Sequence, residues 1–221
     1  MGFKFIEDNT NVGLQIAVDF TASNGNYSDP DSLHYFDPTN QQVTKNPYQK
    51  SMEAAIDVLL HHDRDNQVPL WGFGGIPRKG PQSQLRKVSH CFALNFLEDS
   101  PEVEGKEGIL AAYQNALRFT KLNGPTLFAP VLRKVLDDCK KKMVEEPNYY
   151  CFFLVLTDGW INDFQDTADL LVEACNYPIS IMIVGVGEDD FEQMNDLDDF
   201  KFKNRDGLSP NRDICNFVKF K

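Results

Sequence analysis

The fold follows from one stretch near the start of the chain, Leu14-Gln15-Ile16-Ala17-Val18-Asp19-Phe20-Thr21-Ala22-Ser23. Its first part is short, branched and apolar, as expected of a strand that is buried on both faces of a parallel sheet. Asp19 stands near the carboxyl end of this strand, and polar residues follow at once. In α/β proteins, ligands bind beyond the carboxyl ends of such strands.

Three further apolar runs indicate buried strands of the same kind, at 68–74, 151–156 and 178–184. The run at 151–156 is the most hydrophobic, and it ends in Thr157-Asp158-Gly159. The segment 88–94 alternates between apolar and polar residues, which favours a strand at a sheet edge.

Amphipathic segments between these strands predict helices. Apolar residues recur at helical spacing over 52–60, 107–120 and 131–143. Asp166 or Thr167 is expected to cap a further helix that runs to Cys175. Near the C-terminus we expect a short acidic helix at 191–197, an edge strand at 200–202 and a short helix at 212–217.

The alternation of strands and helices predicts a doubly wound, mostly parallel α/β sheet with helices on both faces and one antiparallel edge strand. A long polar loop is expected at 21–46, and ordered loops of that length are usually functional. Because no repeat or linker interrupts the pattern, residues 1–221 are expected to form a single domain.

Composition excludes some classes of function. Of the 221 residues, 42% are hydrophobic, so the chain can bury a sizeable core. Its 22 basic and 33 acidic residues give a net charge of −11, which disfavours nucleic-acid binding because phosphates need a basic face. The longest apolar stretch, 150–156, is far too short to cross a bilayer, and the N-terminus has no secretion signal.

The five cysteines are odd in number and form no CxxC pair, which argues against a disulfide framework or a zinc module. They are interpreted as reduced thiols of a core. With no secretion signal, this predicts a cytoplasmic protein.

Oxygen-bearing side chains gather where strands are predicted to end. Thr21 and Ser23 follow Asp19 at intervals of two residues, so in an extended segment all three point the same way. Asp158 ends the strand at 151–156, and Thr126 precedes the helix at 131–143. Hard oxygen ligands without sulfur or imidazole favour Mg²⁺ or Mn²⁺.

Each of these residues also has an ordinary structural interpretation. Asp158 alone is more often a turn former, and Thr126 alone is more often a helix cap. The metal-site hypothesis rests on the arrangement, because all of the groups are expected at one edge of one sheet.

The motif from Asp19 to Ser23 resembles the DxSxS metal motif of von Willebrand factor type A domains, the metal-ion-dependent adhesion site. More narrowly, the chain resembles the A domain of copines. The matching stretches cover nearly the whole chain: 18–25, Ser32-Leu33-His34-Tyr35, Gly72-Phe73-Gly74, 108–110, Tyr113, Gly124-Pro125-Thr126, 128–130, 156–159 and 183–187.

This resemblance implies that Thr21, Ser23 and Thr126 offer hydroxyls that face the metal, with Asp19 and Asp158 close to the ion, often through water. Thr21 replaces the commoner serine but keeps the hydroxyl. The resemblance also implies that the domain recruits other proteins, through an acidic side chain of the partner that completes the metal site. Copines carry two C2 domains that bind phospholipid when calcium rises, so contact with membranes is expected only through C2 domains outside this chain.

An enzyme remains the alternative: a phosphotransferase or phosphatase using Asp19 or Asp158 with Mg²⁺ or Mn²⁺. Against this, the chain has neither a GxxxxGK[ST] phosphate loop nor a GxSxG motif, and no histidine is an obvious base. A non-enzymatic interaction module is therefore the favoured prediction.

Overall fold

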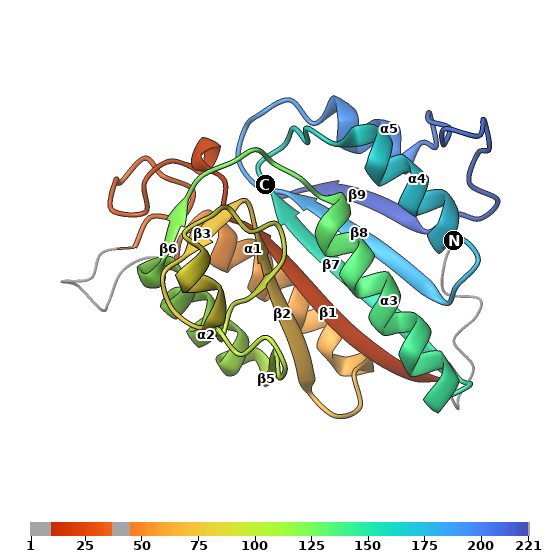
Figure 1. Cartoon of the computed structure of the whole chain (residues 1–221), viewed down its shortest axis with the longest axis horizontal. Coiled ribbons are helices and arrows are strands. Elements are labelled where there is room, and N and C mark those ends of the chain that lie inside the picture. Colours follow the sequence, from red (N-terminus) through yellow and green to blue (C-terminus); the bar gives the residue numbers. More distant parts are fainter. Residues whose placement is uncertain (1–9, 37–44, 221) are drawn as a thin grey trace.

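The computed structural model describes residues 10–36 and 45–220, and part of the polar loop predicted at 21–46 lies outside them. In this part of the chain, a seven-stranded sheet forms the centre of the molecule (Figure 1). Its spatial order is β4-β2-β1-β7-β8-β9, with β5 also paired to β2. The strands are β1 (Asn11–Asp19), β2 (Gln67–Phe73), β4 (Phe92–Ala93), β5 (Glu102–Glu104), β7 (Tyr149–Thr157), β8 (Ile179–Gly185) and β9 (Cys215–Lys219).

Strand β1 is parallel to β2 and β7, and the parallel pairing continues through β8 to β9. Only the short β4 and β5 run antiparallel, and both pair with β2. The predicted mostly parallel sheet with an antiparallel edge is therefore confirmed.

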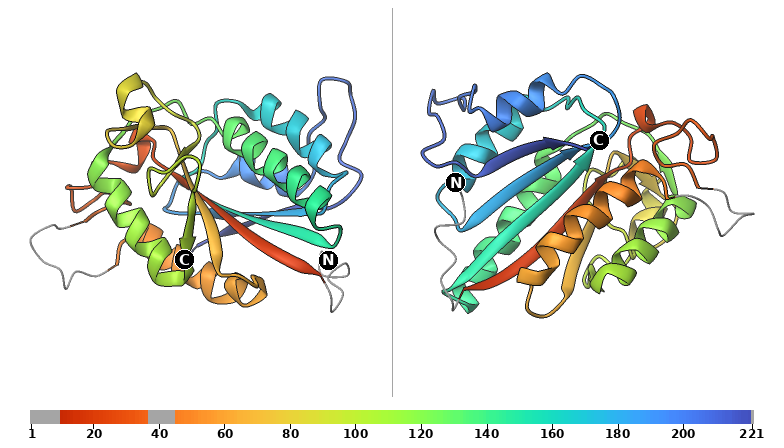
Figure 2. Two further views of the ribbon diagram at one scale, coloured as in Figure 1. Left: turned by 60° about the horizontal axis from the view of Figure 1, so that its bottom comes forward. Right: turned by 180° about the vertical axis from the view of Figure 1, so that it is seen from behind.

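Helices cover both faces of the sheet (Figure 2). Helices α1 (Pro47–Leu59) and α2 (Gly105–Phe119) lie on one face, where they pack against Ile16 and Val18 of β1. Helices α3 (Ala129–Glu145), α4 (Phe164–Ala174) and α5 (Glu192–Asp198) lie on the other face, together with Ala17. Successive residues of β1 thus supply two separate cores, as a strand buried on both sides must.

Strand order reverses between β1 and β7. From β1 the chain proceeds to β2 on one side, and from β7 it proceeds to β8 and β9 on the other. Such a reversal leaves a crevice at the carboxyl ends of the two central strands. Asp19 and Thr157 are the last residues of those strands.

A small two-stranded ribbon that the sequence pattern did not indicate lies beside this edge. Strand β3 (Gly75–Pro77) pairs antiparallel with β6 (Thr120–Leu122). The residue after β6, Asn123, forms an isolated bridge with Thr21 and accepts a hydrogen bond from the Ala22 backbone N–H at 2.5 Å. The ribbon therefore brings the segment before α3 against the loop that follows β1.

Two predictions near the C-terminus were wrong. The helix expected at 212–217 is replaced by β9, whose alternating buried and exposed residues fit the edge of the sheet. The strand expected at 200–202 is irregular, since Phe200 adopts a left-handed φ of 56° and the segment pairs with no strand among the described residues.

Two boundaries also differ from the prediction. Of the segment 88–94, only Phe92–Ala93 forms a strand. Helix α4 begins at Phe164, with Asp163 rather than Asp166 or Thr167 at the N-cap position. The Asp163 carboxylate is engaged elsewhere, at the start of α3.

All five cysteines are free thiols, and four of them are buried. Within residues 10–36 and 45–220, the helices are too short or too polar for any of them to traverse a lipid bilayer.

Candidate metal centre

Asp19 is fully buried at the end of β1, and its carboxylate organises the loop that follows. Its Oδ1 accepts hydrogen bonds from the Thr21 backbone N–H at 2.8 Å and from Thr21 Oγ1 at 2.6 Å. Thr21 Oγ1 lies 2.9 Å from Ser23 Oγ. The three residues therefore do converge, although the segment is extended only as far as Thr21 and Ser23 lies in a short 3-10 helix, Ala22–Asn24.

Strand β7 completes the cluster from the neighbouring position in the sheet. Thr157 Oγ1 donates to Asp19 Oδ2 at 2.8 Å, so both carboxylate oxygens of Asp19 have partners. Asp158 is the next residue, and it is also buried. Sequence reasoning missed Thr157, because its contact with Asp19 depends on the register of β7 with β1.

The two carboxyl groups perturb each other. Burial, followed by the nearby charge of Asp158, raises the pKa of Asp19 to about 7. The pKa of Asp158 is also raised, mainly by burial and further by the charge of Asp189, while hydrogen bonds with Ser23 and Asp19 oppose the rise. Without a cation, the pair is best satisfied by holding a proton.

Thr126 is buried at the same edge, but the structure does not link its side chain to the cluster. Its backbone N–H donates to Asn162 Oδ1 at 2.8 Å, and its carbonyl accepts from the Asn162 N–H at 2.8 Å. Among the described residues, no hydrogen bond joins the Thr126 hydroxyl to Asp19, Thr21 or Ser23.

A second contact ties the same two loops together. The carboxylate of Asp163 accepts from the backbone N–H groups of Phe128 at 3.0 Å and Ala129 at 2.8 Å, where α3 begins. An acid from the loop after β7 therefore caps α3, whose own sequence supplies no capping side chain. Thr126 and Asp158 therefore belong to loops that are fastened to each other through Asn162 and Asp163.

His34 supports the cluster from beneath, and sequence reasoning gave it no role. Its Nδ1 lies 2.7 Å from Tyr113 Oη, and its Nε2 lies 2.8 Å from the Asp19 carbonyl. Because a carbonyl only accepts, Nε2 carries the proton and Nδ1 accepts from the tyrosine. Burial lowers the pKa of His34 to about 3, so the ring is neutral, and it stacks on Tyr48 with centroids 4.1 Å apart.

Gly74 allows β2 to turn away directly beside the cluster. Its φ of 77° lies in the left-handed region, and a Cβ at this position would collide with the Thr21 methyl group. The sequence Gly72-Phe73-Gly74 is one of the stretches that match the family, and this contact gives Gly74 a physical reason.

The donor set fits a hard divalent cation. Within residues 10–36 and 45–220, no three His, Cys, Asp or Glu side chains gather as a metal-binding group, so a site here must combine carboxylates with hydroxyls. Asp19, Thr21, Ser23 and Asp158 offer that combination, and it suits Mg²⁺ or Mn²⁺, which accept oxygen ligands and retain water.

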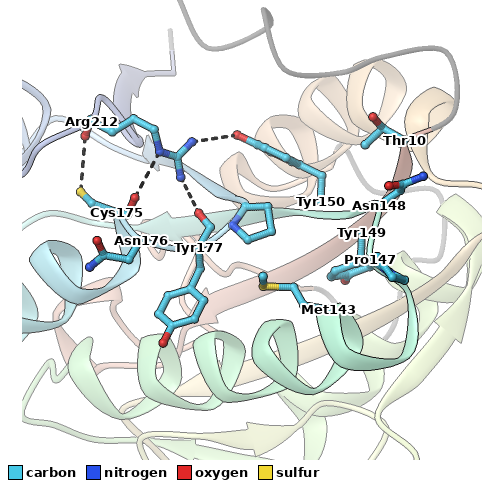
Figure 3. Close-up of a pocket in the computed structure, with 11 residues that line it drawn as sticks. Thr10, Met143, Pro147, Asn148, Tyr149, Tyr150, Cys175, Asn176, Tyr177 and Arg212 are labelled. Atoms are coloured by element: carbon cyan, nitrogen blue, oxygen red, sulfur yellow. Dashed lines mark hydrogen bonds between the residues drawn. The ribbon is translucent and has the colours of Figure 1, made fainter.

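A well-formed cavity lies elsewhere, at the amino ends of the strands (Figure 3). It measures about 500 Å³ and is lined in part by Met143, Pro147 and Tyr150. Arg212 points into it, but its guanidinium donates to the carbonyls of Tyr177 at 2.5 Å and Ile179 at 3.1 Å. This arginine fastens the start of β9 to the loop before β8, and the cavity holds none of the predicted site residues.

The sheet order, with a DxTxS loop at its point of reversal, defines a von Willebrand factor A-type fold. The manganese-loaded TRAP protein from Plasmodium vivax shares this fold, with a TM-score of 0.55 and 15% sequence identity over 96% of this chain and 69% of that chain. A family model for copines matches residues 32–221. The chain belongs to the copine family.

Two curated relatives illustrate the relationship. Protein BONZAI 1 of Arabidopsis thaliana is 40% identical over 218 residues, which cover 97% of this chain and 36% of that protein. Nicotinic receptor-associated protein 1 of Caenorhabditis briggsae is 36% identical over 215 residues, which cover 97% of this chain and 33% of that protein. The chain thus spans about a third of the length of these relatives.

Proposed function

We propose that residues 1–221 form a single metal-dependent protein-interaction domain. One observation carries this proposal: Asp19, Thr21, Ser23 and Asp158, from two neighbouring strand ends, meet at the edge of the sheet where the strand order reverses. Membership of the copine family supports it, because the von Willebrand factor A-type fold is generally an interaction module. A cytoplasmic location, and membrane attachment through the C2 domains of whole copines, are part of the same proposal.

The ion would be Mg²⁺ or Mn²⁺, held by the hydroxyls of Thr21 and Ser23 and by the two carboxyl groups, with Thr126 joining when a partner binds. When bound, it would supply a Lewis-acidic centre for one oxygen of an acidic side chain. Since Asp19 already accepts three hydrogen bonds, its oxygens are held in place before any ion arrives. The neutral hydroxyls leave the ion attractive to an added carboxylate.

An exposed aromatic side chain beside the cluster supports a role in binding proteins. Trp160 follows Asp158 by two residues, and 56% of its surface is exposed. Large aromatic residues are enriched at the centres of protein interfaces because they bury much area with few rotatable bonds. Trp160 is therefore placed to contact the protein that supplies the acidic ligand.

The affinity for the metal is expected to fall when the pH is lowered through about 7. The pKa of Asp19 is raised to about 7, so below this pH an ion must displace a proton from the carboxyl pair. Displacing one proton weakens binding about tenfold for each pH unit. Calorimetric titration with Mn²⁺ at pH 6 and pH 8, in buffers of different ionisation enthalpy, measures both the affinity and the protons released. Equal affinities with no proton release would contradict the assignment of Asp19.

Thr126→Ala is expected to weaken partner binding much more than it weakens ion binding. The Thr126 backbone is held by Asn162, while its hydroxyl has no hydrogen bond to the cluster. When no partner protein is bound, removing that hydroxyl should therefore leave the site unchanged. The probe is a displayed library of random peptides, selected for binding to the wild-type chain in Mn²⁺. The number of peptides retained in Mn²⁺ is compared with the number retained in EDTA. Peptides retained equally with Mn²⁺, with EDTA and by Thr126→Ala would show that recognition uses another surface.

A further inference from the structure

We propose that a cavity lined by Arg78, Arg118 and Lys121, called here the basic pocket, binds a second acidic side chain of the same partner. This inference rests on the proposed function, because the first acidic side chain would bind the ion. The partner would therefore present a segment with two acidic residues, of which one binds the ion and the other binds the basic pocket.

The basic pocket shares a loop with the metal centre. It has a volume of about 450 Å³, and one wall is formed by Ala22 and by 25–28, which directly follow Thr21 and Ser23. The opposite wall comes from the β3–β6 ribbon and the end of α2, which carry the three cations. Because Ala22 hydrogen bonds to Asn123, the two walls are fixed to each other beside the DxTxS loop.

The charge of the pocket contrasts with that of the chain. The net charge is −11, yet three exposed cations gather here. None of the three has an ion pair with any residue in 10–36 or 45–220, whereas Arg133 and Arg205 each pair with two carboxylates. Cations that are gathered without counterions create a local positive potential that attracts an anionic group.

Two further features of the pocket favour an anionic ligand. The guanidinium of Arg118 lies over the Phe36 ring, 4.9 Å from its centroid, which restricts the position of its charge. Thr120 lines the same cavity and is almost fully buried, and its hydroxyl has no hydrogen-bond partner among the described residues. A buried hydroxyl without a partner is unfavourable, so an anionic oxygen that reaches it would gain a further contact.

The other side of the metal centre has the opposite charge. Glu188, Asp189 and Asp190 follow β8, and Asp189 is close enough to raise the pKa of Asp158. An acidic segment that binds the ion would be repelled on this side and attracted on the basic side. The charge pattern therefore sets the direction in which such a segment crosses the site, as complementary fields do at protein interfaces.

The test uses peptides selected by the wild-type chain from the random library in Mn²⁺. The pocket variant carries Arg78→Gln, Arg118→Gln and Lys121→Gln. The control carries Arg64→Gln, Lys141→Gln and Lys142→Gln, which remove the same charge at the other end of the strands. We expect the selected peptides to contain two acidic residues, and the pocket variant to bind them at least about tenfold more weakly than the control does. Mn²⁺ affinity measured by calorimetry should differ less than twofold between the variants.

The outcomes separate this inference from the proposed function. If no peptide prefers Mn²⁺ over EDTA, the proposed function itself fails. If Mn²⁺-dependent peptides bind both variants equally, only the basic pocket is ruled out. Two further measurements test other ligands of the pocket: binding to phosphatidylserine vesicles and binding to inorganic phosphate in EDTA. If the wild type and the control bind either of them and the pocket variant does not, the assignment of an acidic peptide is wrong.

Discussion

Asp19→Asn is expected to abolish binding of Mg²⁺ and Mn²⁺, with an affinity at least about 100-fold below that of the wild type. Loss of a residue that only orients a metal ligand already costs 10- to 100-fold, and Asp19 supplies a negative charge as well as orienting Thr21. Calorimetry reports the affinity, and quenching of the exposed Trp160 by Mn²⁺ gives an independent reading. Trp71 is buried, so it contributes a constant background.

The same substitution should leave the fold intact. A neutral amide in place of a buried carboxyl whose pKa is raised to about 7 removes the unfavourable burial of charge at pH 8. The matched control is Asp63→Asn, because Asp63 is also buried but accepts from the backbone N–H groups of Leu14 and Asn66, both at 2.8 Å, at the other end of β1. It should lower stability by about 1 kcal/mol and leave ion binding unchanged. A result in which both variants bind Mn²⁺ like the wild type would sink the site assignment.

His34→Ala is expected to lower the free energy of unfolding by about 4 kcal/mol, the cost typical of removing a large buried ring. The ring is fully buried, stacks on Tyr48 and packs 5.6 Å from Phe20, centroid to centroid. Its loss leaves a cavity and removes one hydrogen-bond partner each from the Asp19 carbonyl and from the Tyr113 hydroxyl, which keeps only a 3.4 Å contact with Asn46 Oδ1. Urea denaturation in EDTA measures the change without a contribution from bound ion.

Tyr113→Phe separates packing from hydrogen bonding beneath the site. It removes one hydrogen bond to His34 but keeps the ring, so it should cost about 1 kcal/mol. His61→Ala, in the exposed turn after α1, serves as a control in which a histidine is removed and the stability should not change. A His34→Ala protein as stable as the wild type would show that this histidine does not support the Asp19 loop.

Much of the architecture could be predicted from local patterns. Buried parallel strands are continuous apolar runs, so β1, β7 and β8 were recognised with small errors at their ends. The convergence of Asp19, Thr21 and Ser23 was also predicted, but its physical reason was only partly right. The segment is extended as far as Thr21, whereas Ser23 lies in a short 3-10 helix, Ala22–Asn24, that brings its hydroxyl to Thr21. The edge strand β9 was not recognised, since at an edge one face is exposed and its five residues are also compatible with a short helix.

The supporting contacts could not be read in the same way, because they join residues far apart in sequence. His34 and Tyr113 meet only when α2 packs on the sheet, and Thr157 reaches Asp19 only through the register of β1 with β7. The basic pocket likewise draws on three separate segments. In each case the local sequence is ordinary, and the tertiary fold creates the environment.

The cap that Asp163 places on α3 links the start of that helix to the loop after β7. Helix α3 has 17 residues, which corresponds to about 25 Å, and it ends near Met143 at the cavity of Figure 3. Its first turn is held by Asp163, in the loop that carries Asp158, so we expect a displacement of that loop to shift the first turn of the helix as well. Helix α3 therefore connects the carboxyl edge of the sheet to the cavity at its amino edge.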